Sequence, residues 1–179
     1  MQTIIALPQP IREAMAHSLA EPGAAAWMKR AQALHLRYTQ QAEDRQQTHL
    51  TDALDALAYL GLRASATYAQ IWGAVDAVCE LLPHWQPESA LDLGCGPGPG
   101  LWALTTLFPP LTQATAIDQN VHLLALGQQI MEAARLPLAV TWQRGDLLQR
   151  MAQVDSPVDL VLIANVLNEL NADQRTQLL

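Results

Sequence analysis

The chain has 179 residues, of which 50% are hydrophobic and 15% are charged, a composition that excludes a disordered tail, a collagen-like fibre and a low-complexity linker. The net charge is −7, and the sequence has no basic stripe of the kind that neutralises phosphates in dedicated nucleic-acid-binding proteins. No apolar run reaches the roughly 18 residues that cross a bilayer. The N-terminus, which Pro8 and Pro10 interrupt, is unlike a secretory signal, so we expect no membrane anchor and a cytoplasmic protein.

Residues 11–82 are expected to be mostly helical, with a break at Pro22-Gly23. Gly61 is a candidate helix stop, and Ser65 is a candidate N-cap for the helix that follows. Three apolar stripes at helical spacing support this reading. Their members are Trp27, Ala31, Leu34 and Tyr38, then Leu50, Ala53, Leu54, Leu57 and Ala58, then Tyr68, Ile71, Trp72, Val75, Val78, Cys79 and Leu82.

The periodicity changes after Pro83 and Pro87, where short apolar runs begin to alternate with helical stretches. This alternation predicts βαβ units and an α/β fold with a mostly parallel sheet. We therefore divide the chain into a helical N-terminal region or lid, 1–82, a short connection, 83–88, and a sheet domain, 89–179. The expected strands are 89–93, 114–117, 138–142 and 158–164, and the expected helices are 101–108, 121–134, 147–152 and 173–179.

A glycine-rich loop follows the first expected strand in the run Ala90-Leu91-Asp92-Leu93-Gly94-Cys95-Gly96-Pro97-Gly98-Pro99-Gly100. Glycine lets a ligand approach the main chain closely, and the start of the next helix favours an electron-rich partner. The dinucleotide fingerprint G-x-G-x-x-G would need a third glycine at position 99 or 101, where Pro99 and Leu101 stand. No G-K-[ST] follows, so a Walker A loop is excluded as well.

The observed D-x-G-x-G-x-G resembles motif I of the class I S-adenosylmethionine-dependent methyltransferases. The resemblance covers residues 88–170 and implies a Rossmann-like sheet and S-adenosylmethionine as cofactor. In that family the loop backs the methionine part of the cofactor. The loop residues that the resemblance assigns to the cofactor are Asp92, Gly94, Cys95, Gly96 and Gly98.

Five further positions follow from the same resemblance. Asp118, followed by Gln119 after the second strand, matches the acid that binds both ribose hydroxyls, which a carboxylate can accept together. Asp146 matches the acid near the adenine amino group, or else caps the next helix, and Leu147 would lie against the adenine. Asn165, after the fourth strand, matches residues that face the cofactor and the methyl acceptor.

A closer resemblance covers residues 55–172. The run from Tyr59 through Arg63 to Tyr68, the loop LDLGCGPG followed by Trp102, and the segment Val166-Leu167-Asn168-Glu169-Leu170 are similar to the small-ribosomal-subunit methyltransferase-like family of bacteria and mitochondria. This likeness implies that Arg63 and Tyr68 help to bind the cofactor, with the guanidinium on its carboxylate. The alternative is a solvated Arg63 and a core Tyr68.

The chain ends shortly after the fourth expected strand, so we expect a fragment that lacks the last three strands of the family sheet, ordered 3-2-1-4-5-7-6. The fourth strand would then be an exposed edge, which is a template for a homodimer unless the terminal helix or a longer chain covers it. The family's later cysteine cluster, linked to an iron–sulfur centre, would lie beyond Leu179. With only Cys79 and Cys95, and five histidines without ligand spacing, we expect no metal site here.

Three functions remain open at this stage. The first is a methyltransferase acting on ribosomal RNA or another component of the small ribosomal subunit. The second is a non-catalytic protein that binds S-adenosylmethionine and assists ribosome assembly, and the third is a small-molecule methyltransferase. The acidic balance disfavours a free-standing RNA enzyme. No residue is assigned as a general base, because an acceptor needs one only if it is protonated at the working pH.

Overall fold

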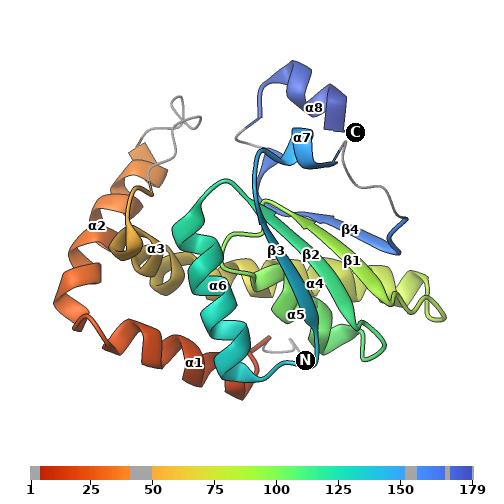
Figure 1. The fold of residues 1–179 in the computed structure, drawn as a ribbon, viewed down its shortest axis with the longest axis horizontal. Helices are drawn as coiled ribbons and strands as arrows, with labels where there is room; N and C mark the ends of the chain where they lie inside the picture. The colour runs from red at the N-terminus through yellow and green to blue at the C-terminus, as the bar shows by residue number, and fades with distance from the viewer. Residues whose placement is uncertain (1–4, 41–49, 152–156, 168–169, 179) are drawn as a thin grey trace.

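The computed structural model describes residues 5–40, 50–151, 157–167 and 170–178 (Figure 1). The N-terminal region is helical, as expected. A break between α1 and α2 falls at residues 21–23, where Gly23 has a φ of 78°. The elements of this region are α1 (Gln9–Ala20), α2 (Ala24–Gln40), α3 (Ala53–Tyr59), the π-helical turn η1 (Leu60–Ala64) and α4 (Ser65–Leu81).

Two details of the N-terminal expectation are wrong. Gly61 does not end a helix, and Ser65 is not an N-cap, because η1 carries the chain continuously from α3 into α4 with helical backbone angles at Ala64 and Ser65. A π turn absorbs an extra residue without breaking the helix. Gly61 serves a packing contact instead: a Cβ there would lie 2.8 Å from the Trp27 ring on α2.

The C-terminal half forms a parallel sheet in the order β3-β2-β1-β4 within the described residues. This order confirms the expected α/β class and the first four strands of the family sheet. The elements are β1 (Ser89–Leu93), α5 (Pro99–Leu107), β2 (Gln113–Asp118), α6 (Val121–Ala134), β3 (Ala139–Arg144), α7 (Leu147–Met151), β4 (Leu160–Ile163) and α8 (Ala172–Leu178).

The two faces of the sheet pack against different sets of helices. One face shares a large apolar core with α4, α5, α6 and the N-terminal helices, in which Trp102 and Tyr68 are among the largest buried side chains. α1 packs on α6, and α4 packs on α5 (Figure 1). A smaller cluster on the other face joins Leu93 and Ile117 to Leu147 of α7 and Leu178 of α8. The N-terminal helices therefore share one core with the sheet.

The fourth strand is shorter and more exposed than its apolar sequence suggests. We expected a strand over 158–164, whereas β4 spans four residues and Val161 is 53% exposed. The reason is its place at the edge: it pairs with β1, and within the described residues no strand pairs with its other side. Asp159, just before β4, accepts hydrogen bonds from the backbone N–H groups of Glu88 and Ser89 and from the Ser89 hydroxyl.

The connection between α4 and β1 packs on the sheet domain. Trp85 contacts Phe108 edge-on, with 5.3 Å between ring centroids, and Pro87 is fully buried. No helix in the described part of the chain is long and apolar enough to cross a membrane.

Candidate functional site

The polar positions singled out in the sequence gather at the carboxyl ends of the parallel strands. The glycine loop follows β1, Asp118 ends β2, Asp146 follows β3, and Asn165 follows β4. Since all four strands are parallel, their carboxyl ends lie together, and in open α/β sheets this edge is where ligands bind.

The glycine loop needs glycine for two different reasons. Gly94 has a φ of 75°, and a Cβ there would lie 2.2 Å from Cγ2 of Val166, so this position allows close packing of the segment after β4. Gly96 has a φ of 54°, but a Cβ there would meet only the Tyr59 ring, at 3.9 Å. Gly94 is therefore required by packing against Val166, whereas Gly96 leaves open space beside the loop.

Asp118 fixes the shape of this loop. Its Oδ2 accepts a hydrogen bond from the Gly96 N–H at 2.8 Å, and its Oδ1 accepts one from the Asn120 N–H at 2.8 Å. Burial raises the pKa of the Asp118 carboxyl above its ordinary value, and the N–H groups around it offset only part of that effect. These hydrogen bonds leave part of the acceptor capacity of the carboxylate for a further donor.

Asp92 and Cys95 lie deeper than the other loop positions. Asp92 is 2% exposed, and its Oδ2 has no hydrogen-bond partner within the described residues. Burial, and then the nearby Asp118 charge, raise the pKa of Asp92 to about 7. Burial also raises the pKa of the Cys95 thiol far above its usual range, so this cysteine stays protonated and is no nucleophile.

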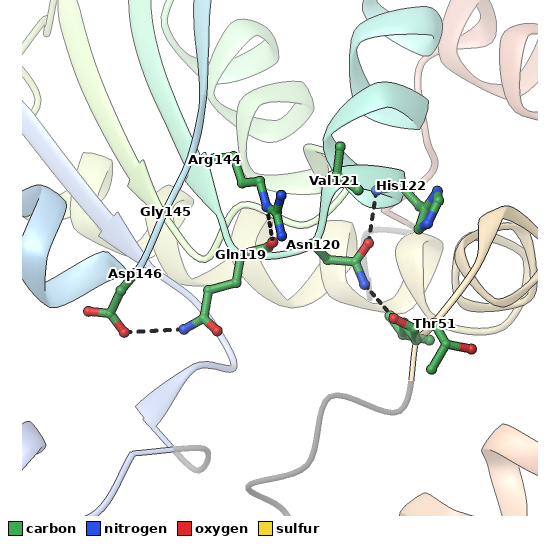
Figure 2. Close-up of a pocket in the computed structure, with 9 residues that line it drawn as sticks. Thr51, Gln119, Asn120, Val121, His122, Arg144, Gly145 and Asp146 are labelled. Atoms are coloured by element: carbon green, nitrogen blue, oxygen red, sulfur yellow. Dashed lines mark hydrogen bonds between the residues drawn. The ribbon is translucent and has the colours of Figure 1, made fainter.

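A pocket of about 540 Å³ opens beside Asp118, between the ends of β2 and β3 and the segment before α3 (Figure 2). Asp146 uses both carboxylate oxygens here. Oδ1 accepts from the N–H groups of Leu148 and Gln149 at the start of α7, and Oδ2 accepts from Gln119 Nε2 at 3.3 Å. The pocket is lined by Leu50, Thr51, Gln119, Asn120, Val121, His122, Arg144, Gly145 and Asp146.

The geometry of Asp146 shows the helix cap and leaves the adenine contact a prediction. Asp146 caps α7 with one oxygen, and its other oxygen lies at the pocket, bonded to Gln119, so the cap does not exclude a ligand contact. Arg144 donates from Nε to the Gln119 carbonyl at 3.3 Å, so the three side chains form one rim of the pocket (Figure 2).

Several pocket residues were missed by the sequence analysis. Asn120 had a local signal: its Oδ1 accepts from the N–H groups of His122 and Leu123, which is the N-cap pattern expected at the start of a helix. Leu50 and Thr51 had none, because they reach the pocket from 70 residues away in the chain.

The remaining predicted positions are more dispersed. Tyr68 is 1% exposed and lies in the apolar core, while Arg63 is exposed in η1. Leu147 is buried in the smaller core cluster. Asn165 is exposed and has a φ of 61°, a left-handed conformation that asparagine tolerates. Asn168 and Glu169, from the segment that carries the closer resemblance, lie outside the described residues.

No group of three or more histidine, cysteine, aspartate or glutamate side chains in the described part of the chain is arranged to hold a metal ion.

Comparison with known proteins identifies the family. Residues 53–179 match the family model Rsm22, described as mitochondrial small ribosomal subunit Rsm22. The chain belongs to the Rsm22 family. Among curated proteins, this Rsm22 family chain is 36% identical over 96 residues to trans-aconitate 2-methyltransferase of Pseudomonas aeruginosa. That match covers 52% of the chain and 32% of the other protein, so the Rsm22 family chain aligns with about a third of its curated relative.

Solved structures show the same fold. An O-methyltransferase family protein from Burkholderia thailandensis has a TM-score of 0.60 and 16% sequence identity over 94% of this chain and 47% of that one. The plantazolicin methyltransferase BpumL, in complex with SAH, has a TM-score of 0.50 and 19% identity over 94% of this chain and 56% of that one. The Rsm22 family chain thus has the Rossmann-like methyltransferase fold that the glycine loop predicted.

Proposed function

We propose that this chain contains the cofactor-binding half of an S-adenosylmethionine-dependent methyltransferase. The observation that carries the proposal is that the glycine loop, bonded to Asp118, and the Gln119–Asp146 pair, which lines a pocket, lie at the carboxyl ends of neighbouring parallel strands. Membership of the Rsm22 family and the methyltransferase fold support it. When bound, S-adenosylmethionine supplies an already activated methyl group.

The residues present fit the cofactor. The loop at Gly96 leaves room for close backbone approach. Asp118 retains acceptor capacity for the two ribose hydroxyls, and Asp146 with Gln119 offers an acceptor and an amide at the place where the family binds the adenine amino group. Because such a transfer needs little besides correct alignment of acceptor and methyl, the task of these residues is to bind and orient.

The acceptor that we favour is ribosomal RNA or another component of the small ribosomal subunit. The reason is that the family model matching residues 53–179 is described by the mitochondrial small ribosomal subunit. A small organic acid is the second candidate, since the curated relative in Pseudomonas aeruginosa is named for trans-aconitate. The aligned part is 32% of that relative, and the net charge of −7 disfavours unaided RNA binding. A non-catalytic role in ribosome assembly remains compatible with the same cofactor site.

One experiment separates these functions. The chain is incubated with radiolabelled S-adenosylmethionine and small ribosomal subunits, total RNA or trans-aconitate. Label in the subunit or its RNA supports the favoured acceptor, and label in the acid supports the second. Binding of S-adenosylhomocysteine without transfer to any of them supports the assembly factor, and no binding refutes the cofactor assignment.

We further propose that β4 provides an association surface for a second copy of the chain. Within the described residues no strand pairs with the outer side of β4, and Val161 is 53% exposed; both support this idea, because an apolar sheet edge is a template for pairing.

A further inference from the structure

A short segment before α3 forms one side of the pocket. Leu50 and Thr51 line it, and Thr51 lies across from Asp146 (Figure 2). Both residues precede position 53, where the match to the family model begins. This wall is therefore supplied by the N-terminal region rather than by the sheet, and its position depends on what holds it there.

Asn120 holds the segment from the side of the sheet. Its Nδ2 donates to the Leu50 carbonyl at 2.8 Å, while its Oδ1 caps α6. Its own N–H donates to Asp118 Oδ1. One buried side chain thus connects the start of α6 to the segment, directly beside the carboxylate proposed to bind the ribose.

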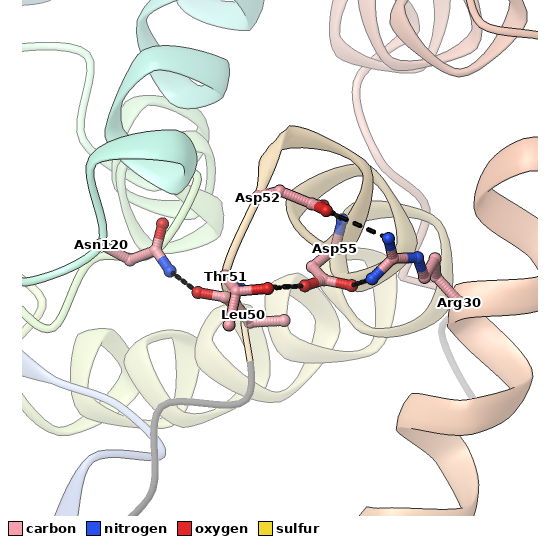
Figure 3. Close-up of polar contacts among 6 residues, drawn as sticks. All are labelled: Arg30, Leu50, Thr51, Asp52, Asp55 and Asn120. Carbon is pink, nitrogen blue, oxygen red and sulfur yellow. Dashed lines mark hydrogen bonds and ion pairs between the residues drawn. The ribbon is translucent and has the colours of Figure 1, made fainter.

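Asp55 holds the segment from the side of the helices (Figure 3). Its Oδ2 accepts from both the N–H and the hydroxyl of Thr51, each at 2.9 Å, and its Oδ1 accepts from Arg30 Nη1 on α2 at 3.0 Å. Asp55 is 8% exposed. Burial alone would raise its pKa, but the Thr51 hydrogen bonds and the Arg30 charge outweigh burial and lower it. The carboxylate therefore remains ionised at neutral pH and able to accept all three bonds.

We propose that Asp55, held by Arg30, is a positioning residue for the cofactor pocket: it fixes Thr51, and with it the wall that closes the pocket on the nucleoside. Neither Asp55 nor Arg30 lines the pocket. The inference rests on the proposed function. It extends the nucleoside site into the N-terminal region and makes ligand affinity depend on an ion pair between α2 and α3.

The test is a titration of S-adenosylhomocysteine into the parent chain and four variants. R30Q removes the partner of Asp55 and should weaken binding about three- to fivefold, the range of a partly exposed ion pair. R30K restores the charge and should recover most of that loss. D55N should weaken binding about tenfold, since charge-assisted bonds are lost. K29Q is the matched control, because it removes the neighbouring charge on α2 and should bind like the parent.

A second measurement reports on the wall directly. Hydrogen exchange at the Thr51 amide should accelerate in R30Q and D55N and stay unchanged in K29Q. If D55N fails to fold, R30Q decides alone, because it alters a half-exposed side chain. A parent that does not bind S-adenosylhomocysteine overturns the proposed function and this inference with it. A parent that binds, with R30Q equal to it in affinity and Thr51 exchange, overturns the inference alone.

Discussion

Asp118 and Gly96 are 22 residues apart in the chain, yet the Asp118 Oδ2 accepts the Gly96 N–H at 2.8 Å. The carboxylate that is proposed to bind the ribose thus also fixes the loop that is proposed to back the methionine. This hydrogen bond connects the two parts of the proposed cofactor site, so a substitution at Asp118 should alter both of them.

Replacing Asp118 with Ala should lower the affinity for S-adenosylhomocysteine at least about tenfold, because hydrogen bonds to a charged group contribute roughly 1.5–3 kcal/mol each. Isothermal titration calorimetry measures the loss. The matched control is Asp173→Ala, which removes an exposed carboxylate from the first turn of α8 and should leave the affinity unchanged. Equal binding by D118A and the parent would refute the ribose assignment.

Asp92 should make the stability of the ligand-free chain depend on pH. With a pKa of about 7 in the folded chain against an ordinary 3.8, the folded state keeps a proton that the unfolded state releases. The free energy of unfolding of the parent should therefore fall, relative to Asp92→Asn, as the pH rises from 4 to 7. Each unit of difference between the folded and unfolded pKa corresponds to about 1.4 kcal/mol, so the pH-dependent loss of unfolding free energy reaches at most about 4 kcal/mol. Urea unfolding at several pH values measures it, and parallel curves would contradict it.

Two loop glycines should respond differently to the same substitution. In Gly94→Ala the new methyl meets Val166 Cγ2 at 2.2 Å, so we expect destabilisation of at least about 2 kcal/mol from overpacking and backbone strain. In Gly96→Ala nothing lies closer than 3.9 Å, which leaves the left-handed backbone cost of about 1–2 kcal/mol. Denaturant unfolding compares the two, and calorimetry should show weaker ligand binding by G96A. Equal destabilisation would show that the packing argument is wrong.

The side of β4 with which no strand pairs in the described part of the chain should support self-association. Val161→Lys places a charge on that edge and should shift sedimentation equilibrium toward the monomer. Leu82→Lys is the matched control, because both side chains are 53% exposed in the parent but only Val161 lies on β4. A parent that stays monomeric at every concentration while its β4 amides exchange rapidly would exclude both association and coverage of the edge.

Local signals in the sequence were enough to locate much of this fold. β1 and α6 have the bounds that were expected, 89–93 and 121–134, because each begins and ends at a turn or cap residue next to a strong apolar period. The glycine loop and Asp118 were identified for the same reason, since strand, loop and acid follow one another at short spacing.

Features that depend on contacts between distant segments could not be predicted. The residues around Gly61 do not predict a π turn. The need for glycine there comes from its contact with Trp27, which lies on another helix. The Leu50 carbonyl has no sequence mark that relates it to Asn120. The fourth strand was expected at an exposed edge, but its short length and the half-exposed side chain of Val161 depend on the segments around it and had no local signal.

The sheet order has a consequence for how the chain folds. β1 lies between β2 and β4. A short crossover separates β1 from β2 in the chain, whereas β1 and β4 are far apart in the chain: Ser89 and Asp159, which meet there, are 70 residues apart. Contacts at large sequence separation form late, because the entropy of closing the loop must be overcome first. We expect β1, β2 and β3 to assemble in the order of synthesis. β4 then docks last, and the Asp159 contacts with Glu88 and Ser89 secure its start only once the rest of the sheet exists.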